Sequence, residues 1–120
     1  MRKHKFRGKR LDNKEWVIGS LLVDTDGHCY IVNDMKTFRT VDEVDPETVG
    51  EFTGVGNIYE GDIFNLGDKN IRYVVVWHDS GFMGKSVGAH GSFVGLEHWK
   101  ARIDLIGNIH DNPDLLEAQP

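Results

Sequence analysis

The chain has 120 residues, a formal net charge of −5 and one cysteine, Cys29. A single cysteine excludes an internal disulfide, and no apolar run reaches the roughly 18–20 residues that a membrane helix needs. These properties predict a cytoplasmic protein with no membrane contact. A chain of this size forms one domain over residues 1–120 and buries a core without covalent cross-links.

Positive charge gathers at the N-terminus, in a segment that we call the basic arm (residues 1–10). Its cationic residues are Arg2, Lys3, Lys5, Arg7, Lys9 and Arg10. The remaining 8 Lys and Arg stand against 19 carboxylates, so the rest of the chain has a formal charge of 8 − 19 = −11. A basic arm can bind nucleic-acid phosphates, form a solvated first strand, or dock on the acidic body of another subunit. With so acidic a remainder, nucleic acid is an alternative partner and not the favoured one.

The first half of the chain has the pattern of short strands joined by turns. Alternating or continuous apolar runs, rich in β-branched and aromatic residues, predict the strands. They fall at residues 5–10, 15–19 continuing through 20–24, 28–32, 38–44 and 48–52. Thr25, Asp26 and Gly27 form the hairpin turn between the second and third of these strands.

The second half continues in the same style. Residues 62–66 and 71–77 flank a four-residue turn and predict the clearest hairpin. The segment 79–92 contains four glycines and is predicted to be a mobile or tightly turning loop. Further strands are expected at residues 92–96 and 103–109. A short C-terminal helix is expected at residues 112–118, because Asn112 suits the N-cap and Pro113 the first helical position.

Trp77 and Phe52 are the predicted core aromatics. Phe82 and Met83 lie between glycines in the predicted loop, where apolar side chains either contact a partner or belong to a disordered loop. They join the basic arm as candidate contact residues for a partner.

The polar residues that could act in catalysis or metal binding can also be explained by structural roles. Glu60 and Asp62 either fix a glycine-rich turn, act as ligands of a divalent cation or as an acid/base pair, or contact a partner. His78, Asp79 and His90 would be the residues of a metal-dependent hydrolase, although they lack the spacing of a zinc motif. Neither catalytic nor metal-binding residues are therefore assigned, a cofactor is not expected, and an enzyme is less expected than a binding protein.

Several segments together resemble the YopX family of phage and prophage proteins. The carriers are residues 50–54 (GEFTG), 58–63 (IYEGDI), Val76-Trp77 and 106–116 (IGNIHDNPDLL), with 5–8 (KFRG) and 15–19 (EWVIG) at the start. The resemblance covers roughly residues 4–116. The turn at Val55, Gly56 and Asn57 is shorter than the loop that relatives often carry.

The resemblance implies a β-rich core related to small Src-homology-type barrels, oligomer formation and a mobile-element origin. It implies no activity and no catalytic residue. The predicted fold is α+β and mainly β: a bent antiparallel sheet or a small Src-homology-type barrel with a short C-terminal helix. The predicted function is a non-enzymatic phage or prophage module that self-associates and binds another macromolecule, either a phage or a host protein. The alternatives are a nucleic-acid-associated barrel that uses the basic arm, and the metal-dependent hydrolase.

Overall fold

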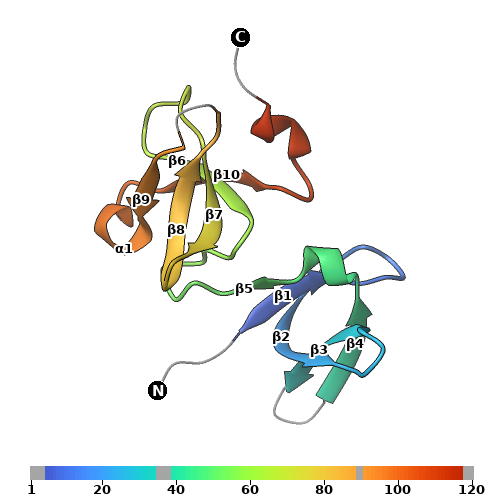
Figure 1. Cartoon of the computed structure of the whole chain (residues 1–120). Coiled ribbons are helices and arrows are strands. Elements are labelled where there is room, and N and C mark those ends of the chain that lie inside the picture. The colour runs from blue at the N-terminus through green and yellow to red at the C-terminus, as the bar shows by residue number, and fades with distance from the viewer. Residues whose placement is uncertain (1–4, 35–38, 89–90, 118–120) are drawn as a thin grey trace. The chain divides into compact units, whose positions relative to one another are not determined.

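A computed structural model describes residues 5–34, 39–88 and 91–117 of the chain (Figure 1). The fold is mainly β, as predicted, with two antiparallel five-stranded sheets and little helix. The chain divides into two compact units, Met1–Phe52 and Thr53–Pro120, and each contains one of the sheets. The expectation of a single folding domain over residues 1–120 stays a prediction.

The first unit contains a sheet of order β4-β3-β2-β1-β5 (Figure 1). Its elements are β1 (Phe6–Lys9), β2 (Trp16–Val23), β3 (Cys29–Asp34), β4 (Arg39–Val44), the 3-10 helix η1 (Pro46–Thr48) and β5 (Gly50–Glu51). The predicted strands are thus present, although 48–52 shrinks to two residues because Thr48 belongs to η1. Asp45 caps η1 by accepting a hydrogen bond from the Glu47 N–H at 3.0 Å.

The sheet of the first unit bends far enough for its first and fourth strands to meet at one point. An isolated bridge joins Arg10, just after β1, to Val44 at the end of β4. In the part of the chain that is described, pairing goes no further, so the sheet stays open. The prediction of a bent antiparallel sheet is confirmed, and the described strands do not form a closed barrel.

The core of the first unit is small. Cys29, Ile31 and Val44 are buried, and Phe6, Val17, Leu21 and Val49 pack against them. Gly19 permits the close approach of β2 and β3, because a Cβ there would lie 2.2 Å from the Val32 carbonyl oxygen. A side chain at this position would push the two backbones apart.

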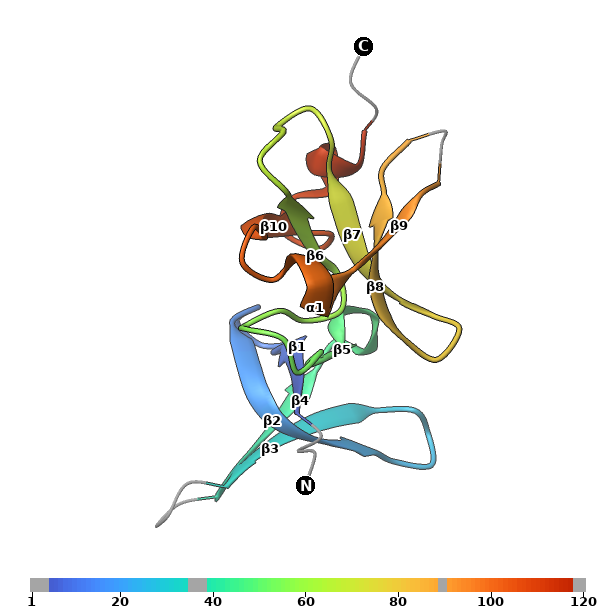
Figure 2. The same cartoon turned by 90° about the vertical axis from the view of Figure 1, so that its left-hand side faces the viewer.

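The second unit contains a sheet of order β10-β6-β7-β8-β9, seen from a second side in Figure 2. Its elements are β6 (Asp62–Asn65), β7 (Tyr73–His78), β8 (Gly81–Ser86), β9 (Phe93–Gly95), the helix α1 (Leu96–Trp99), β10 (Asp104–Asn108) and the 3-10 helix η2 (Pro113–Leu116). The core consists of Ile58, Phe64, Val75 and Leu96, with partly buried apolar residues around them.

The expectation of a loop over residues 79–92 is wrong for its first half. Residues 81–86 form β8, which lies between β7 and β9 (Figure 2). The turn before it is only Asp79-Ser80, since His78 pairs with Gly81, and Asp79 has a φ of 57°. Gly84 provides room for the ring of Phe64, so here a glycine marks close packing and not a loop.

Two other expectations need correction. Trp77 is not a core residue: its side chain is 52% exposed near the end of β7. Phe52 is only partly buried. The C-terminal helix is a single 3-10 turn, and Asn112 does not cap it with its side chain. Its Oδ1 instead accepts a hydrogen bond from the Asn108 N–H at 3.2 Å, in space that the missing side chain of Gly107 leaves.

Candidate functional site

Residues 5–9 of the basic arm contain β1 and three cations that lie over aromatic rings. Lys5 Nζ lies 4.5 Å from the ring centre of Phe52. Arg7 Cζ and Lys9 Nζ lie 4.6 Å and 5.4 Å from that of Trp16. Such cation–π contacts stabilise a partly exposed strand. β1 therefore has a structural role, and a binding role for these three residues stays a prediction.

The other cations of the arm differ from these three. Arg2 and Lys3 lie outside the described residues. Arg10 donates from Nη2 to Asp12 Oδ2 at 2.8 Å, and its Nε lies 3.6 Å from Asp42 Oδ1. The hydrogen bond with Asp12 is the main cause that raises the pKa of Arg10 above its usual value. Arg10 is thus committed to carboxylates of its own unit.

Phe82 and Met83 belong to β8 and not to a loop tip. Phe82 packs against the core of the second unit, and its ring meets that of Trp77 edge to face at 4.9 Å. Met83 lies between Val76 and Gly95 on the neighbouring strands. Both side chains are half-buried. Their proposed contact with a partner stays a prediction.

Glu60 and Asp62 lie at a turn. Gly61 adopts a φ of 93°, which favours glycine. Asp62 is buried, and its Oδ2 accepts a hydrogen bond from the Tyr59 N–H at 2.8 Å. This bond satisfies a buried donor, so the structural explanation of Asp62 is confirmed.

The residues of the hydrolase hypothesis have other contacts. The ring of His78 stacks on Phe93 with centres 3.9 Å apart, and its Nε2 lies 3.7 Å from Asp79 Oδ2. His90 lies outside the described residues. Among the residues that are described, no three His, Cys, Asp or Glu side chains gather as metal ligands.

The most distinctive surface is one that the sequence did not single out: the solvent side of β2, β3 and β4. We call it the outer face and define it by Ile18, Leu22, Tyr30, Val32 and Val41. Strand register places Leu22 opposite Tyr30, and Val32 opposite Val41. Ile18, Leu22 and Val41 are 43%, 56% and 55% exposed. Apart from the exposed Ser20, which lies opposite Val32, these positions carry apolar side chains where an isolated sheet would present polar ones.

Acidic groups lie beside the outer face. Glu43 pairs with Tyr30 across the strands, and Asp24 Oδ2 lies 3.3 Å from the Tyr30 hydroxyl. Desolvation and the charge of Asp24 raise the pKa of Tyr30. Desolvation acts to raise the pKa of Asp24 as well, but hydrogen bonds from the His28 and Asp26 N–H groups hold it below its usual value.

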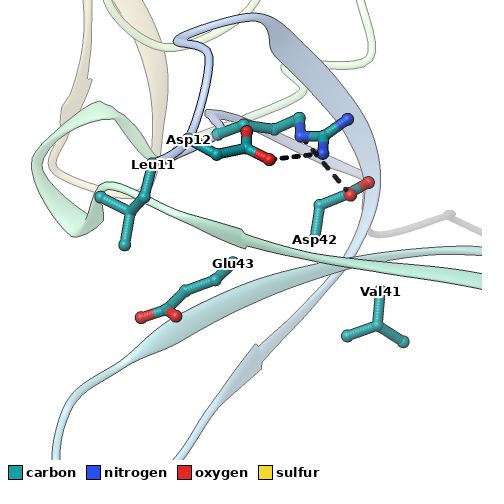
Figure 3. A pocket seen from close by; sticks show the side chains of 6 residues that line it. Leu11, Asp12, Val41, Asp42 and Glu43 are labelled. Atoms are coloured by element: carbon teal, nitrogen blue, oxygen red, sulfur yellow. Dashed lines mark hydrogen bonds and ion pairs between the residues drawn. The ribbon is translucent and has the colours of Figure 1, made fainter.

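A pocket of about 250 Å³ lies at the edge of β4 (Figure 3). Its lining is Arg10, Leu11, Asp12, Val41, Asp42 and Glu43. Figure 3 shows the carboxylates of Asp12 and Asp42 directed to the Arg10 guanidinium, and that of Glu43 turned away from it. Leu11 and Val41 add exposed apolar walls.

A second hollow, of about 420 Å³, lies in the second unit beside Ile71 and Tyr73. Ser86 Oγ accepts a hydrogen bond from the Ser92 N–H at 2.9 Å, so this hydroxyl stabilises the local backbone.

The geometry defines a class of protein: two open antiparallel sheets whose notable surfaces are an apolar face and an acidic strand edge. No helix in the described part of the chain is long and apolar enough to span a membrane. The family model described as YopX protein matches residues 5–117, so the chain belongs to the YopX family. A search of curated proteins found no match.

Proposed function

We propose that this YopX-family chain is a phage-type, non-enzymatic module that binds other proteins, including copies of itself. The exposed apolar outer face carries the proposal. Leu22 and Val41 are each more than half exposed on this face, Leu22 opposite Tyr30 and Val41 opposite Val32, two residues further along β3. Apolar area of this kind is stabilised when a partner removes it from water.

The occupant that we propose for the outer face is a second copy. The five residues that define the face carry no charge; the charged residues on the same side, Glu43 opposite Tyr30 and Arg7 opposite Ile18, lie at its two margins, on β4 and β1. A two-fold axis parallel to the strands places the β4 side of one sheet over the β1 side of the other. Glu43 of one copy then does not meet Glu43 of the other. Instead, the β4 side of one copy, which bears Glu43, lies toward β1 of the other copy, which bears Arg7.

Sedimentation velocity of the full chain over a wide concentration range tests this proposal. Leu22→Ser removes an apolar side chain twice per dimer. Because each leucine is about half exposed beforehand, the loss is roughly 1.5–3 kcal/mol in total, or about 10–100-fold in the dimer dissociation constant. Leu105→Ser is the matched control, because Leu105 is 42% exposed on β10 of the other unit.

Two results would overturn self-association through this face. One is a monomer at every concentration in both low and moderate salt. The other is an equal loss of association in Leu22→Ser and Leu105→Ser.

Nucleic-acid binding by the basic arm needs a different test from deletion. β1 pairs with both β2 and β5, so removing the arm would remove an interior strand of the sheet. Arg2→Gln with Lys3→Gln lowers the charge outside β1 instead. Salt-sensitive binding to DNA that this double variant weakens would support the alternative function.

A further inference from the structure

The edge of β4 begins a strand ladder that the first unit does not complete. The Leu11 N–H donates to the Glu43 carbonyl at 3.1 Å, and the Asp45 N–H donates to the Lys9 carbonyl at 2.8 Å. These two bonds flank the bridge between Arg10 and Val44. After Leu11 the chain turns back toward β2, because Arg10 and Glu15 are joined by a backbone hydrogen bond. The ladder between the end of β1 and β4 therefore stops after the single pair of Arg10 and Val44.

The next outward position on β4 is Val41. In an antiparallel strand, successive residues direct their N–H and C=O groups to opposite neighbours. The Glu43 carbonyl points away from β3, so Val41, two residues before it, also directs its N–H and C=O away from β3. Within the described ranges no strand pairs with that side of β4. An open edge of this kind is a template for an added strand.

The pocket of Figure 3 lies where this added strand would begin. It is bounded by the turn at Arg10, Leu11 and Asp12 on one side and by Val41 to Glu43 on the other. Val41 and Leu11 are 55% and 53% exposed, and they offer apolar contact to a side chain beside the strand.

The charge of the pocket selects the partner. On the side that Asp42 faces, Asp12 and Asp42 contribute two carboxylates and Arg10 one guanidinium, a formal charge of 1 − 2 = −1, and Glu43 adds a further carboxylate on the outer-face side of β4. Arg10 holds Asp12 and Asp42, while Glu43 is directed elsewhere. A basic side chain placed here would neutralise negative charge of the pocket that Arg10 does not.

We propose that the β4 edge binds an extended, basic segment of another protein by strand addition. An apolar residue of that segment pairs with Val41 on the outer-face side, and a Lys or Arg lies opposite Asp42 on the other side. The required pattern is therefore an alternation of apolar and basic residues. A second copy of β4 is disfavoured here because antiparallel pairing of two such edges would bring the carboxylates of Asp42 and Glu43 near their own copies. The proposal rests on the protein-binding role proposed above but not on self-association.

Fluorescence anisotropy with the full chain tests the proposal. The probe is a dye-labelled peptide that alternates Val and Lys over six residues. One control peptide carries Glu in place of Lys, and a second keeps the Val/Lys sequence but is N-methylated on alternate residues along the hydrogen-bonding edge. We expect binding of the first peptide only, because charge and main-chain hydrogen bonds are both required.

Val41→Pro tests the edge from the protein side. The Val41 N–H is not used by β3, so proline there removes an outward donor and leaves the ladder between β3 and β4 intact. We expect roughly tenfold weaker binding of the Val/Lys peptide, with the urea midpoint retained. Asp42→Asn with Glu43→Gln keeps the edge and removes two charges, and we expect a similar loss that high salt reproduces in the unmodified chain.

Absence of binding by the Val/Lys peptide, or equal binding of the N-methylated peptide, would overturn strand addition. If Val41→Pro does not fold, the comparison of the peptides still decides the question. Leu22→Ser separates the two proposals when the peptide is titrated at chain concentrations where the unmodified chain is monomeric, because Leu22 is not on the β4 edge and its replacement should then leave the peptide affinity unchanged.

Discussion

Gly84→Ala is the sharpest test of the packing in the second unit. Gly84 is buried in the middle of β8, between Val75 on β7 and Val94 on β9. A Cβ added there would lie 2.5 Å from Cζ of Phe64 and 3.0 Å from Cγ2 of Val94. Carbon atoms in favourable contact are about 3.5–4.0 Å apart, so the new methyl group would clash with the core.

The clash has no easy relief. The Phe64 ring is fully buried and stacks on Tyr73 with centres 5.3 Å apart, so any shift of the ring must displace core neighbours such as Tyr73. Overpacking of a filled core costs about 1–3 kcal/mol. Apart from the clash, a glycine-to-alanine change at a position without positive φ, such as Gly84, stabilises by about 0.4–1 kcal/mol, because it restricts the unfolded chain.

Gly81→Ala is the matched control. Gly81 lies on the same strand, and a Cβ there would meet nothing within 4 Å. Since both variants restrict the unfolded chain equally, the difference in their free energies of unfolding isolates the clash, which we expect to be about 1–3 kcal/mol. Urea unfolding followed by tryptophan fluorescence measures it. Equal stabilities would refute the packing argument and would fit the loop that the glycines of this segment suggest.

Two further predictions concern carboxylates in turns. Asp62→Ala leaves the buried Tyr59 N–H without its acceptor, so we expect the free energy of unfolding to fall by about 1–3 kcal/mol; unchanged stability, or a midpoint that Ca²⁺ raises in the unmodified chain, would contradict the structural role. The folded-state pKa of Asp24 is lowered, so its contribution to stability is complete above its unfolded pKa of about 4 and is lost as the pH falls through the folded value. The stability of Asp24→Asn should therefore fall less steeply than that of the unmodified chain in this acid range, and parallel curves in urea titrations would count against it.

Local sequence patterns predicted most strands because strand and turn residues alternate clearly. The hairpin of Asp62–Asn65 and Tyr73–His78 combines β-branched residues with a turn rich in Gly, Asp and Asn. β8 escaped this reasoning because a glycine that makes room for a distant ring has the same local signature as a glycine in a loop. Only the position of Phe64, twenty residues earlier, distinguishes the two roles of Gly84.

The candidate surfaces were harder to foresee. In β2, Val17 and Leu21 face the core while Ile18 and Leu22 face solvent, so the strand is apolar on both sides and has no alternation to reveal an exposed face. The pocket at β4 depends on the bridge between Arg10 and Val44, which are far apart in sequence. Such long-range register is fixed by the packing of the whole sheet and cannot be obtained from local propensity.

The single cysteine gives the protein a built-in reporter of native-state opening. Cys29 is buried against Ile31 and Val44 in the core of the first unit. A buried thiol reacts with an alkylating reagent only when the structure around it opens, so the alkylation rate measures how often this core is exposed. Val75, by contrast, lies in the core of the second unit, so amide exchange at Val75 reports the opening of the other sheet. Comparing alkylation of Cys29 with this exchange would measure the opening of each sheet separately and show whether the two sheets open as one cooperative body.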